Sequence, residues 1–226
     1  MNNPKIIAHR GASFHAPENT ISAVKKAIEM NSDMIELDAR MTKDDEIVII
    51  HDPNVDRTTD GKGYVKDMTL EQIKRLRINN NEEIPTLQEV IDIIKGKCKL
   101  NLHIKEKRTL SNILKIIKDN ALYNEVLLSS FNEKTLIYIK EIDPRIKTGY
   151  LLRRPTPFYV DIGKRLGADY LHPAYKIATK RMVKRAQKYG FKVNIWTLKD
   201  KKSVLISRSY GVDGLITNDP LLYEDK

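Results

Sequence analysis

The stretch that decides the fold is Met34-Ile-Glu-Leu-Asp-Ala-Arg-Met-Thr-Lys-Asp-Asp-Glu-Ile-Val-Ile-Ile-His-Asp52. It predicts a strand, a tight turn at 43–46 and a returning strand that leads to His51. Successive side chains of a strand point to opposite faces, so Glu36 and Asp38 share one face. Adjacent carboxylates repel each other unless one binds a proton or a cation neutralises them, which makes the pair suitable for a divalent metal. The returning strand would bring an imidazole towards them, and a metal with a base in one cleft suggests hydrolysis.

Composition limits the class of protein. A chain of 226 residues can build one large core, and α/β barrels of this size are commonly one domain. We therefore expect a single domain over 1–226 with a small insertion at 53–85. The apolar runs are short and the first residues lack a secretory pattern, so neither a transmembrane helix nor a stable membrane anchor is expected. The single cysteine, Cys98, excludes an intrachain disulfide and suits a reducing compartment, which predicts a cytoplasmic protein.

The formal charge of +10 raises the question of a nucleic-acid partner. The densest basic group recurs at helical spacing and comprises Lys180, Arg181, Lys184, Arg185 and Lys188. The residues of this segment expected to turn inward are Met182, Val183, Ala186 and Tyr189. This pattern is typical of a solvated helix face, so no nucleic-acid partner is expected. The positive field would instead attract anionic substrates or phospholipid surfaces.

Short β-branched runs alternate with helical patterns along the chain, which is typical of βαβ units and a parallel sheet. The expected strands are 5–9, 34–40, 99–105, 126–130, 146–151, 168–172, 192–197 and 213–217. Asn19 or Thr20 can cap a helix over 21–30, and Thr69 and Thr86 each open a capping box. Repeated β-then-α units in a chain of this size predict an α/β fold, a closed (β/α)₈ TIM barrel, with an open doubly wound sheet as the alternative.

Chemically unusual residues fall at the carboxyl ends of the expected strands, where the active sites of such barrels lie. They are His9 and Arg10, Glu36 and Asp38, His103 and Lys105, Ser129 and Ser130, and Trp196 and Thr197. A lone Glu-x-Asp is more often the polar face of a surface strand, and this coincidence argues against that explanation.

The expected strand at 99–105 has two chemically different faces. Its even-numbered residues are Leu100, Leu102 and Ile104, and its odd-numbered ones include Asn101, His103 and Lys105. In a barrel the polar face would line the lumen. A buried lysine and histidine need anionic partners, which a phosphate and the carboxylates would supply.

These residues resemble the glycerophosphodiester phosphodiesterase family nearly end to end. The first half carries His9-Arg-Gly11, Pro17-Glu-Asn-Thr20, Glu36-Leu-Asp38, Thr42-Lys-Asp44, His51-Asp52, Arg57-Thr-Thr59 and Gly63. The second half carries Ile84-Pro-Thr-Leu87, Ser129-Ser-Phe131, Trp196-Thr197, Gly211-Val-Asp-Gly214 and Thr217-Asn-Asp-Pro220. One tripeptide would be weak support, but the ordered set at strand ends favours homology.

The resemblance implies a metal-dependent barrel that hydrolyses deacylated phospholipids, a small-molecule substrate, to sn-glycerol 3-phosphate and an alcohol. A phosphodiester resists attack because its anionic oxygens repel nucleophiles, so cations and proton transfer are needed. The expected roles are as follows: catalytic His9 and His51; substrate-binding Arg10, Lys105 and Trp196; metal-binding Glu36, Asp38 and His103. His15, Phe131 and His172 receive no role.

His103 stands where relatives usually carry a glutamate as the third metal ligand. The expected cofactor is a divalent cation, Mg²⁺, Mn²⁺ or Ca²⁺. Imidazole in place of a carboxylate removes a negative charge and a hard oxygen, which disfavours Ca²⁺ relative to Mn²⁺, Co²⁺ or Zn²⁺. Alternatively, His103 only hydrogen-bonds the phosphate or a metal-bound water.

Three other functions compete with this interpretation. A lysophospholipase D-type enzyme would need an apolar groove, for which only the insertion at 53–85 is a candidate. A non-catalytic phosphodiester-binding barrel would have lost a catalytic residue, whereas His9 and His51 are both present. Nucleic-acid binding is suggested by charge alone. The pattern is compatible with several alcohols as leaving group, with attack by water or by the substrate's 2-hydroxyl, and with any oligomeric state.

Overall fold

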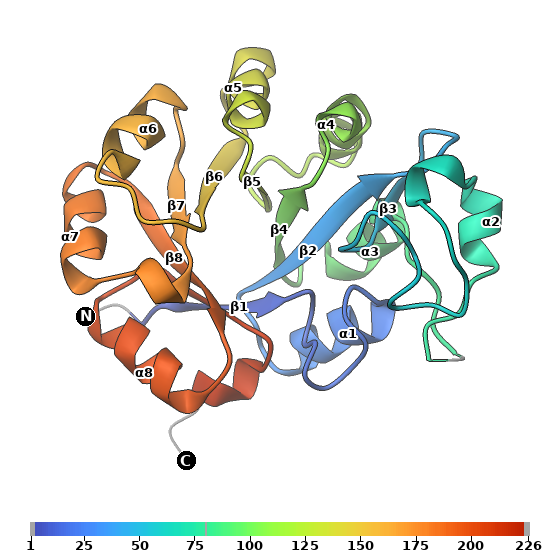
Figure 1. The fold of residues 1–226 in the computed structure, drawn as a ribbon, viewed down its shortest axis with the longest axis horizontal. Coiled ribbons are helices and arrows are strands. Elements are labelled where there is room, and N and C mark those ends of the chain that lie inside the picture. The colour runs from blue at the N-terminus through green and yellow to red at the C-terminus, as the bar shows by residue number, and fades with distance from the viewer. Residues whose placement is uncertain (1–2, 80, 224–226) are drawn as a thin grey trace.

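Eight parallel strands close into a barrel with helices around its outside (Figure 1). The computed structural model describes residues 3–79 and 81–223. The barrel strands are β1 (Lys5–His9), β2 (Met34–Met41), β4 (Lys99–Ile104), β5 (Val126–Ser130), β6 (Lys147–Leu152), β7 (Tyr170–Pro173), β8 (Lys192–Leu198) and β9 (Gly214–Thr217). Each pairs with the next, and the circle closes because β1 pairs with both β2 and β9. The predicted TIM barrel is therefore confirmed, and the open sheet is excluded.

Helices follow the strands and cover the barrel from outside. The longer ones are α1 (Ile21–Glu29), α3 (Leu87–Ile94), α4 (Leu110–Asp119), α5 (Glu133–Ile142), α6 (Tyr159–Arg165), α7 (Lys180–Lys188) and α8 (Lys201–Ser209). Thr20 caps α1 by accepting from the backbone N–H of Ala23, and Thr86 forms the predicted capping box with Glu89 at α3. Asn19 is not the cap, because its side chain is used elsewhere, in the barrel interior.

Alternation along the strands separates a packed outer layer from a mixed interior. Leu100, Leu102 and Ile104 are buried in the main hydrophobic cluster between sheet and helices. Inside the barrel, a small apolar cluster consists of Ile7, Met34, Leu127 and Ile216. Polar side chains such as Asn101 and His103, on β4, are also buried in the interior. The lumen thus combines apolar packing with buried polar groups.

The chain between β2 and α3 forms a small structure beside the end of β2. β3 (Ile47–Ile49) runs antiparallel to β2, as the strand, turn and returning strand predicted. It is followed by η1 (Val65–Asp67) and α2 (Leu70–Lys74), whose N-terminus has the predicted capping box at Thr69. These elements share a core made of Val48, Ile50, Val55, Val65, Ile73, Ile78 and Ile84. The segment lies beside β2 and α3 at one side of the barrel (Figure 1), and it carries His51, two residues after the end of β3.

The amino ends of the strands are joined by an arrangement that occurs three times among the described residues, which we call the reciprocal aspartate bridge. Asp33, Asp169 and Asp213 each directly precede a strand. Each carboxylate accepts from a backbone N–H at the start of the preceding strand, that of Ile6 (2.8 Å), Thr148 (2.9 Å) or Val193 (2.8 Å). Each aspartate N–H donates back to the carbonyl of the same residue. Side chain and backbone together thus fix the strand pairs β1/β2, β6/β7 and β8/β9.

Helix α7 carries the basic face predicted from its sequence, with one correction. Val183 and Ala186 are buried as expected, and Met182 is half-buried. Tyr189 is 47% exposed and lies under the ammonium of Lys164, 4.1 Å from the ring centre, so the expectation that it turns inward is wrong. The reason is that α7 ends at Lys188, and Tyr189 has already left the helical periodicity.

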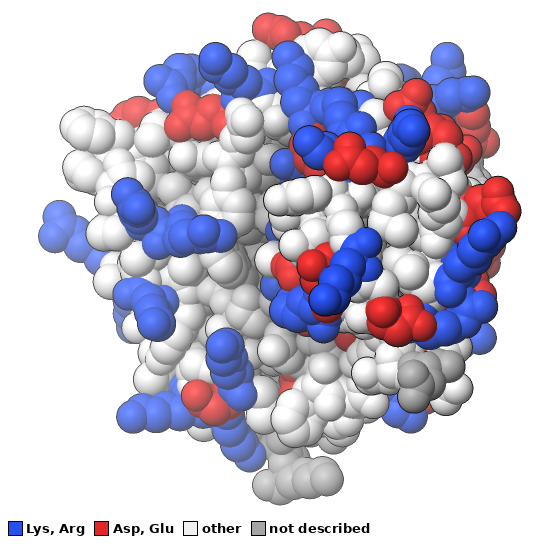
Figure 2. All heavy atoms as spheres, turned by 45° about the vertical axis from the view of Figure 1, so that its right-hand side comes forward, with Lys and Arg blue, Asp and Glu red and all other residues white. Residues whose placement is uncertain are grey.

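Charged side chains are distributed over the surface. On the face drawn in Figure 2, Lys and Arg side chains are scattered and interspersed with Asp and Glu rather than gathered in one stripe. Among residues 3–79 and 81–223, no helix has the length and apolar character needed to cross a bilayer.

The bridge at Asp169 makes a prediction about acid stability. Burial acts to raise the pKa of Asp169, but hydrogen bonds from Lys140 and Lys147 outweigh it and leave that pKa below its usual value. The stabilisation is therefore present above the unfolded pKa of about 3.9 and is lost as the pH falls through the lower folded pKa. We expect Asp169→Asn to lower the free energy of unfolding by about 1–3 kcal/mol at pH 7 and by much less at pH 3.

Urea unfolding at both pH values measures the effect. Asp143→Asn is the matched control, because Asp143 is paired with Arg145 on the surface and joins no strands. Equal loss in the two variants, or a loss in Asp169→Asn that does not shrink at low pH, would contradict the assignment.

Candidate active site

A cavity of about 300 Å³ opens at the carboxyl ends of the strands. All of the residues to which a role was assigned from the sequence line it, namely His9, Arg10, Glu36, Asp38, His51, His103, Lys105 and Trp196. The lining also includes Asn101, Ser129, Phe131, Leu151, Arg153, Thr197 and Ile216. The barrel therefore brings together in one place side chains that are dispersed over nearly the whole sequence.

Two buried carboxylates from β2 form the centre of the cavity. Glu36 accepts from the backbone N–H of Arg10 at 3.1 Å. Burial, followed by the charge of Asp38, raises the pKa of Glu36 to about 8. Burial acts in the same direction on Asp38, but His103 and Lys105 outweigh it and hold the pKa of Asp38 well below its usual range. Asp38 is thus held ionised by its neighbours, whereas Glu36 lacks charged partners strong enough to lower its pKa.

Asp38 is held from several sides. Asn19 donates its side-chain amide to one carboxylate oxygen at 3.1 Å and accepts from the backbone N–H of Asp38 at 3.2 Å. The Lys105 ammonium lies 2.9 Å from the other oxygen, and Arg10 Nε lies 3.5 Å from the first. This arrangement fixes the carboxylate and gathers two cations on one side of the cavity.

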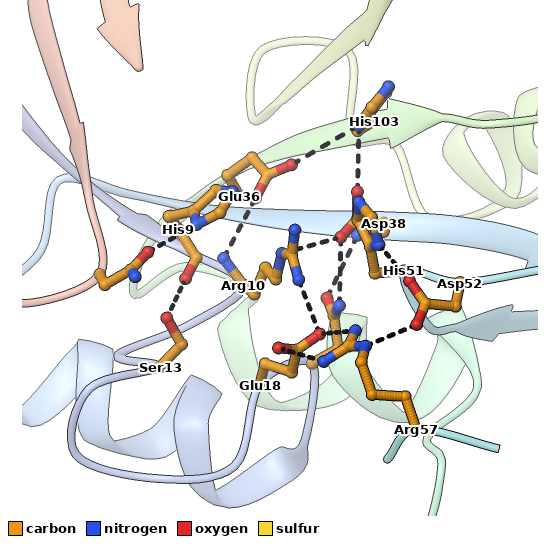
Figure 3. Close-up of polar contacts among 12 residues, drawn as sticks. His9, Arg10, Ser13, Glu18, Glu36, Asp38, His51, Asp52, Arg57 and His103 are labelled. Carbon is orange, nitrogen blue, oxygen red and sulfur yellow. Dashed lines mark hydrogen bonds and ion pairs between the residues drawn. The ribbon is translucent and has the colours of Figure 1, made fainter. Parts of the chain in front are cut away.

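Glu36, Asp38 and His103 form a group able to hold a metal ion. One ligand atom of each lies within 4.8 Å of the others, and all three residues are buried. His103 Nδ1 is 3.0 Å from Asp38 and 4.0 Å from Glu36 (Figure 3). Asn101 is the register partner of Glu36 on β4, and its buried Oδ1 has no hydrogen-bond partner among the described residues. Two carboxylates, an imidazole and an unsatisfied amide oxygen are a donor set that fits a divalent cation.

Two histidines lie at the cavity with different partners. His9 Nδ1 is 2.7 Å from the side-chain oxygen of Asn218, so Nδ1 carries the proton, and Nε2 lies 3.9 Å from Glu36. Burial and then the charge of Arg10 lower the pKa of His9 to about 4. His51 Nδ1 lies 2.6 Å from the carboxylate of Asp52. Burial lowers the pKa of His51 too, although Asp38 and Asp52 act in the opposite direction.

The remaining predicted residues complete the walls. Arg10 follows β1 with a positive φ of 57°, and its guanidinium is hydrogen-bonded to Glu18 at 2.7 Å. Trp196 is half-buried at the end of β8 and donates from Nε1 to the carbonyl of His172. Its ring packs edge-to-face with Phe131, whose ring contacts that of His103 in the same way. The cavity thus has a charged wall and an aromatic wall.

Comparison with known proteins agrees with the motifs. The family model described as "Glycerophosphoryl diester phosphodiesterase family" matches residues 9–222. The chain belongs to this family. A glycerophosphodiester phosphodiesterase of Caldanaerobacter subterraneus is 40% identical over 228 residues, covering 95% of this chain and 94% of the relative. The corresponding enzyme of Bacillus altitudinis is 30% identical and covers 96% of this chain and 95% of its own length.

Solved structures give the same result. A phosphodiesterase of Oleispira antarctica, in complex with the product sn-glycerol-3-phosphate, superposes with a TM-score of 0.91 at 29% identity, covering 96% of this chain and 94% of the other. The glycerophosphodiester phosphodiesterase of Thermotoga maritima does so with a TM-score of 0.83 at 27% identity, covering 99% and 98%. The expected family and the expected enzyme class, a glycerophosphodiester phosphodiesterase, are thereby confirmed.

Sequence reasoning did not assign every residue of this phosphodiesterase cavity. Arg153 lines it and places its guanidinium 4.7 Å from the ring centre of Phe131. Asn218 belongs to the quoted motif at 217–220, but its contact with His9 becomes visible only when the barrel closes.

Two histidines without a predicted role lie outside the cavity lining. His172 is fully buried in the barrel, with Nε2 3.2 Å from the side-chain amide of Asn194. His15 pairs with Asp219 at 2.7 Å. Neither therefore belongs to the charged wall.

Proposed function

We propose that the protein hydrolyses glycerophosphodiesters to sn-glycerol 3-phosphate and an alcohol, with the scissile phosphate bound in the cavity. The observation that carries the proposal is the convergence of two differently partnered histidines, two cations and a buried carboxylate pair on one cavity. The named activity of the relatives and the product bound to the Oleispira antarctica enzyme support the same chemistry.

The partners of the histidines suggest a division of the two proton transfers. His9, buried and hydrogen-bonded to a neutral amide oxygen, is kept neutral and acts as the base that takes a proton from the attacking water. His51 pairs with the Asp52 carboxylate, which opposes the lowering of its pKa by burial, so we assign to His51 the proton given to the leaving alcohol oxygen. One P–O bond forms, one breaks, and each histidine exchanges one proton.

Two cations and an indole would bind the substrate. Arg10 presents a planar fork suited to phosphate oxygens, and Lys105 adds a point charge close by. Both are held beside Asp38 and need little rearrangement to contact an anion. Trp196, with Phe131 behind it, offers an apolar surface to the glyceryl part.

A divalent cation would be held by Glu36, Asp38 and His103, whose donor atoms cluster as described. The raised pKa of Glu36 supports this metal site. It is raised because Glu36 is buried beside Asp38, and a bound cation would neutralise the charge of the pair. When bound, such an ion supplies positive charge for the phosphate oxygens.

The first prediction from this proposal concerns activity and cofactor. The purified protein should release glycerol 3-phosphate from glycerophosphocholine or a related diester, and a chelator should abolish this until metal is restored. An enzyme-coupled assay for glycerol 3-phosphate measures it, with a lysophosphatidylcholine as the comparison substrate for the lysophospholipase D alternative. Full activity in excess chelator would refute the dependence of the activity on a metal.

The second prediction concerns the histidines. His9→Ala and His51→Ala should each lower turnover by about two to four orders of magnitude, the range for general acid and base groups, with the fold unchanged. His15→Ala is the matched control, because His15 lies outside the cavity lining. A variant that keeps the wild-type rate would remove that histidine from the mechanism.

The third prediction concerns His103. If its imidazole is a ligand, activity should prefer a transition metal over Ca²⁺, and His103→Glu should shift preference towards hard cations, because it restores a carboxylate oxygen. Metal titrations followed by calorimetry measure the affinities. Unchanged metal affinity in His103→Ala, together with impaired phosphate binding, would show that His103 contacts the phosphate instead.

A further inference from the structure

A continuous chain of charged contacts runs outside the reacting groups and joins two of them (Figure 3). In order, it passes through His51, Asp52, Arg57, Glu18 and Arg10. Its two ends are the proposed leaving-group acid and a proposed phosphate-binding residue. Its middle member, Arg57, does not line the cavity and has no role in the chemistry described above.

Arg57 is bound at three of its nitrogens. Nε donates to Asp52 at 2.5 Å, while the two terminal nitrogens donate to the two oxygens of Glu18 at 3.0 and 2.7 Å. The Arg57 side chain is 48% exposed, whereas the side chains of Glu18 and Asp52 are 23% and 24% exposed. Only a planar fork with several donors can bind both partners in one fixed orientation, which an ammonium group cannot do.

The contact of Arg57 with Asp52 affects His51. Asp52 offers one oxygen to His51 Nδ1 and the other to Arg57, so the arginine determines how the carboxylate is turned towards the imidazole. A carboxylate on Nδ1 directs Nε2 to the opposite side of the ring, towards the substrate, and stabilises the protonated ring.

The contact of Arg57 with Glu18 affects Arg10. Glu18 accepts from Arg57 and from Arg10, the latter at 2.7 Å. Arg57 belongs to the segment after β3 and Glu18 to the loop before α1, 39 residues apart. One side chain of the insertion thus connects the loop that carries the phosphate fork to the loop that carries the acid.

We propose that Arg57 is a positioning residue that holds His51 through Asp52 and Arg10 through Glu18, so that leaving-group protonation and phosphate binding are aligned together. This inference rests on the proposed function. A merely structural ion pair would alter stability, and any loss of activity would be the same for every substrate.

The test uses two substrates that differ in their need for an acid. Glycerophosphocholine has an alkoxide leaving group that must be protonated, whereas the 4-nitrophenyl ester of sn-glycerol 3-phosphate releases a weakly basic phenolate. We expect Asp52→Asn to lower kcat for the choline ester by about 10- to 100-fold, the range for supporting residues, and for the nitrophenyl ester by less than about threefold. Glu18→Gln should instead raise KM for both esters by a similar factor.

Arg57→Gln should show both effects at once, a selective fall in kcat for the choline ester and a raised KM for both. Arg57→Lys should remain impaired, because it keeps the charge but not the fork. Arg75→Gln is the matched control, since Arg75 lies in the same segment and forms an ion pair with Glu71 away from the cavity. It should behave as wild type with both substrates.

Equal losses for both esters in Asp52→Asn and Arg57→Gln, or full activity in Arg57→Lys, would overturn the proposal. If Arg57→Gln does not fold, as judged by thermal unfolding, Asp52→Asn and Glu18→Gln still test the two sides separately. Assays run at saturating metal with wild-type enzyme in parallel. A wild-type enzyme that cleaves neither ester refutes the proposed function itself, which is a different result from a lost difference between esters.

Discussion

Two carboxylates on the same face of a buried strand cannot both be ionised unless positive charge surrounds them, and the mouth of this barrel is arranged around that constraint. Asp38 is kept ionised by Lys105, His103 and Arg10, while Glu36 is left with a pKa near 8. This difference between the two carboxylates favours the binding of a cation in the cavity. The cations that hold Asp38 are those that we propose bind the phosphate, so in this proposal one electrostatic arrangement serves both the metal ion and the substrate.

The barrel supplies this arrangement through the alternation of its strands. Residues that face outward, such as Leu102, pack against helices, while their neighbours in the chain point into the lumen. Inside the barrel a small cluster of apolar side chains packs beneath the cavity and supports the polar groups. Fixing charged groups before the substrate arrives avoids reorganisation during the reaction, which is how such sites stabilise developing charge.

Much of the fold and of the cavity lining could be predicted from the sequence, because the patterns that indicate them are local. The strand at 99–105 was recognisable because side chains on a strand have a period of two, and the start of α1 because Thr20 precedes an amphipathic run. Tyr189 was misplaced because periodicity does not show where a helix ends. Contacts between distant loops, such as that of His9 with Asn218, depend on closure of the barrel. They have no local signal even when both residues belong to recognised motifs.

The reciprocal aspartate bridges at Asp33, Asp169 and Asp213 lie at the amino ends of the strands, opposite the cavity, so the two rims of the barrel have separate roles. The rim at the amino ends of the strands is fastened by side-chain and backbone bonds that involve none of the cavity residues. Loops at the opposite rim can therefore be lengthened, shortened or exchanged without loosening these fastenings. In evolutionary terms, the substrate range of such a chain is free to drift while its barrel is inherited unchanged.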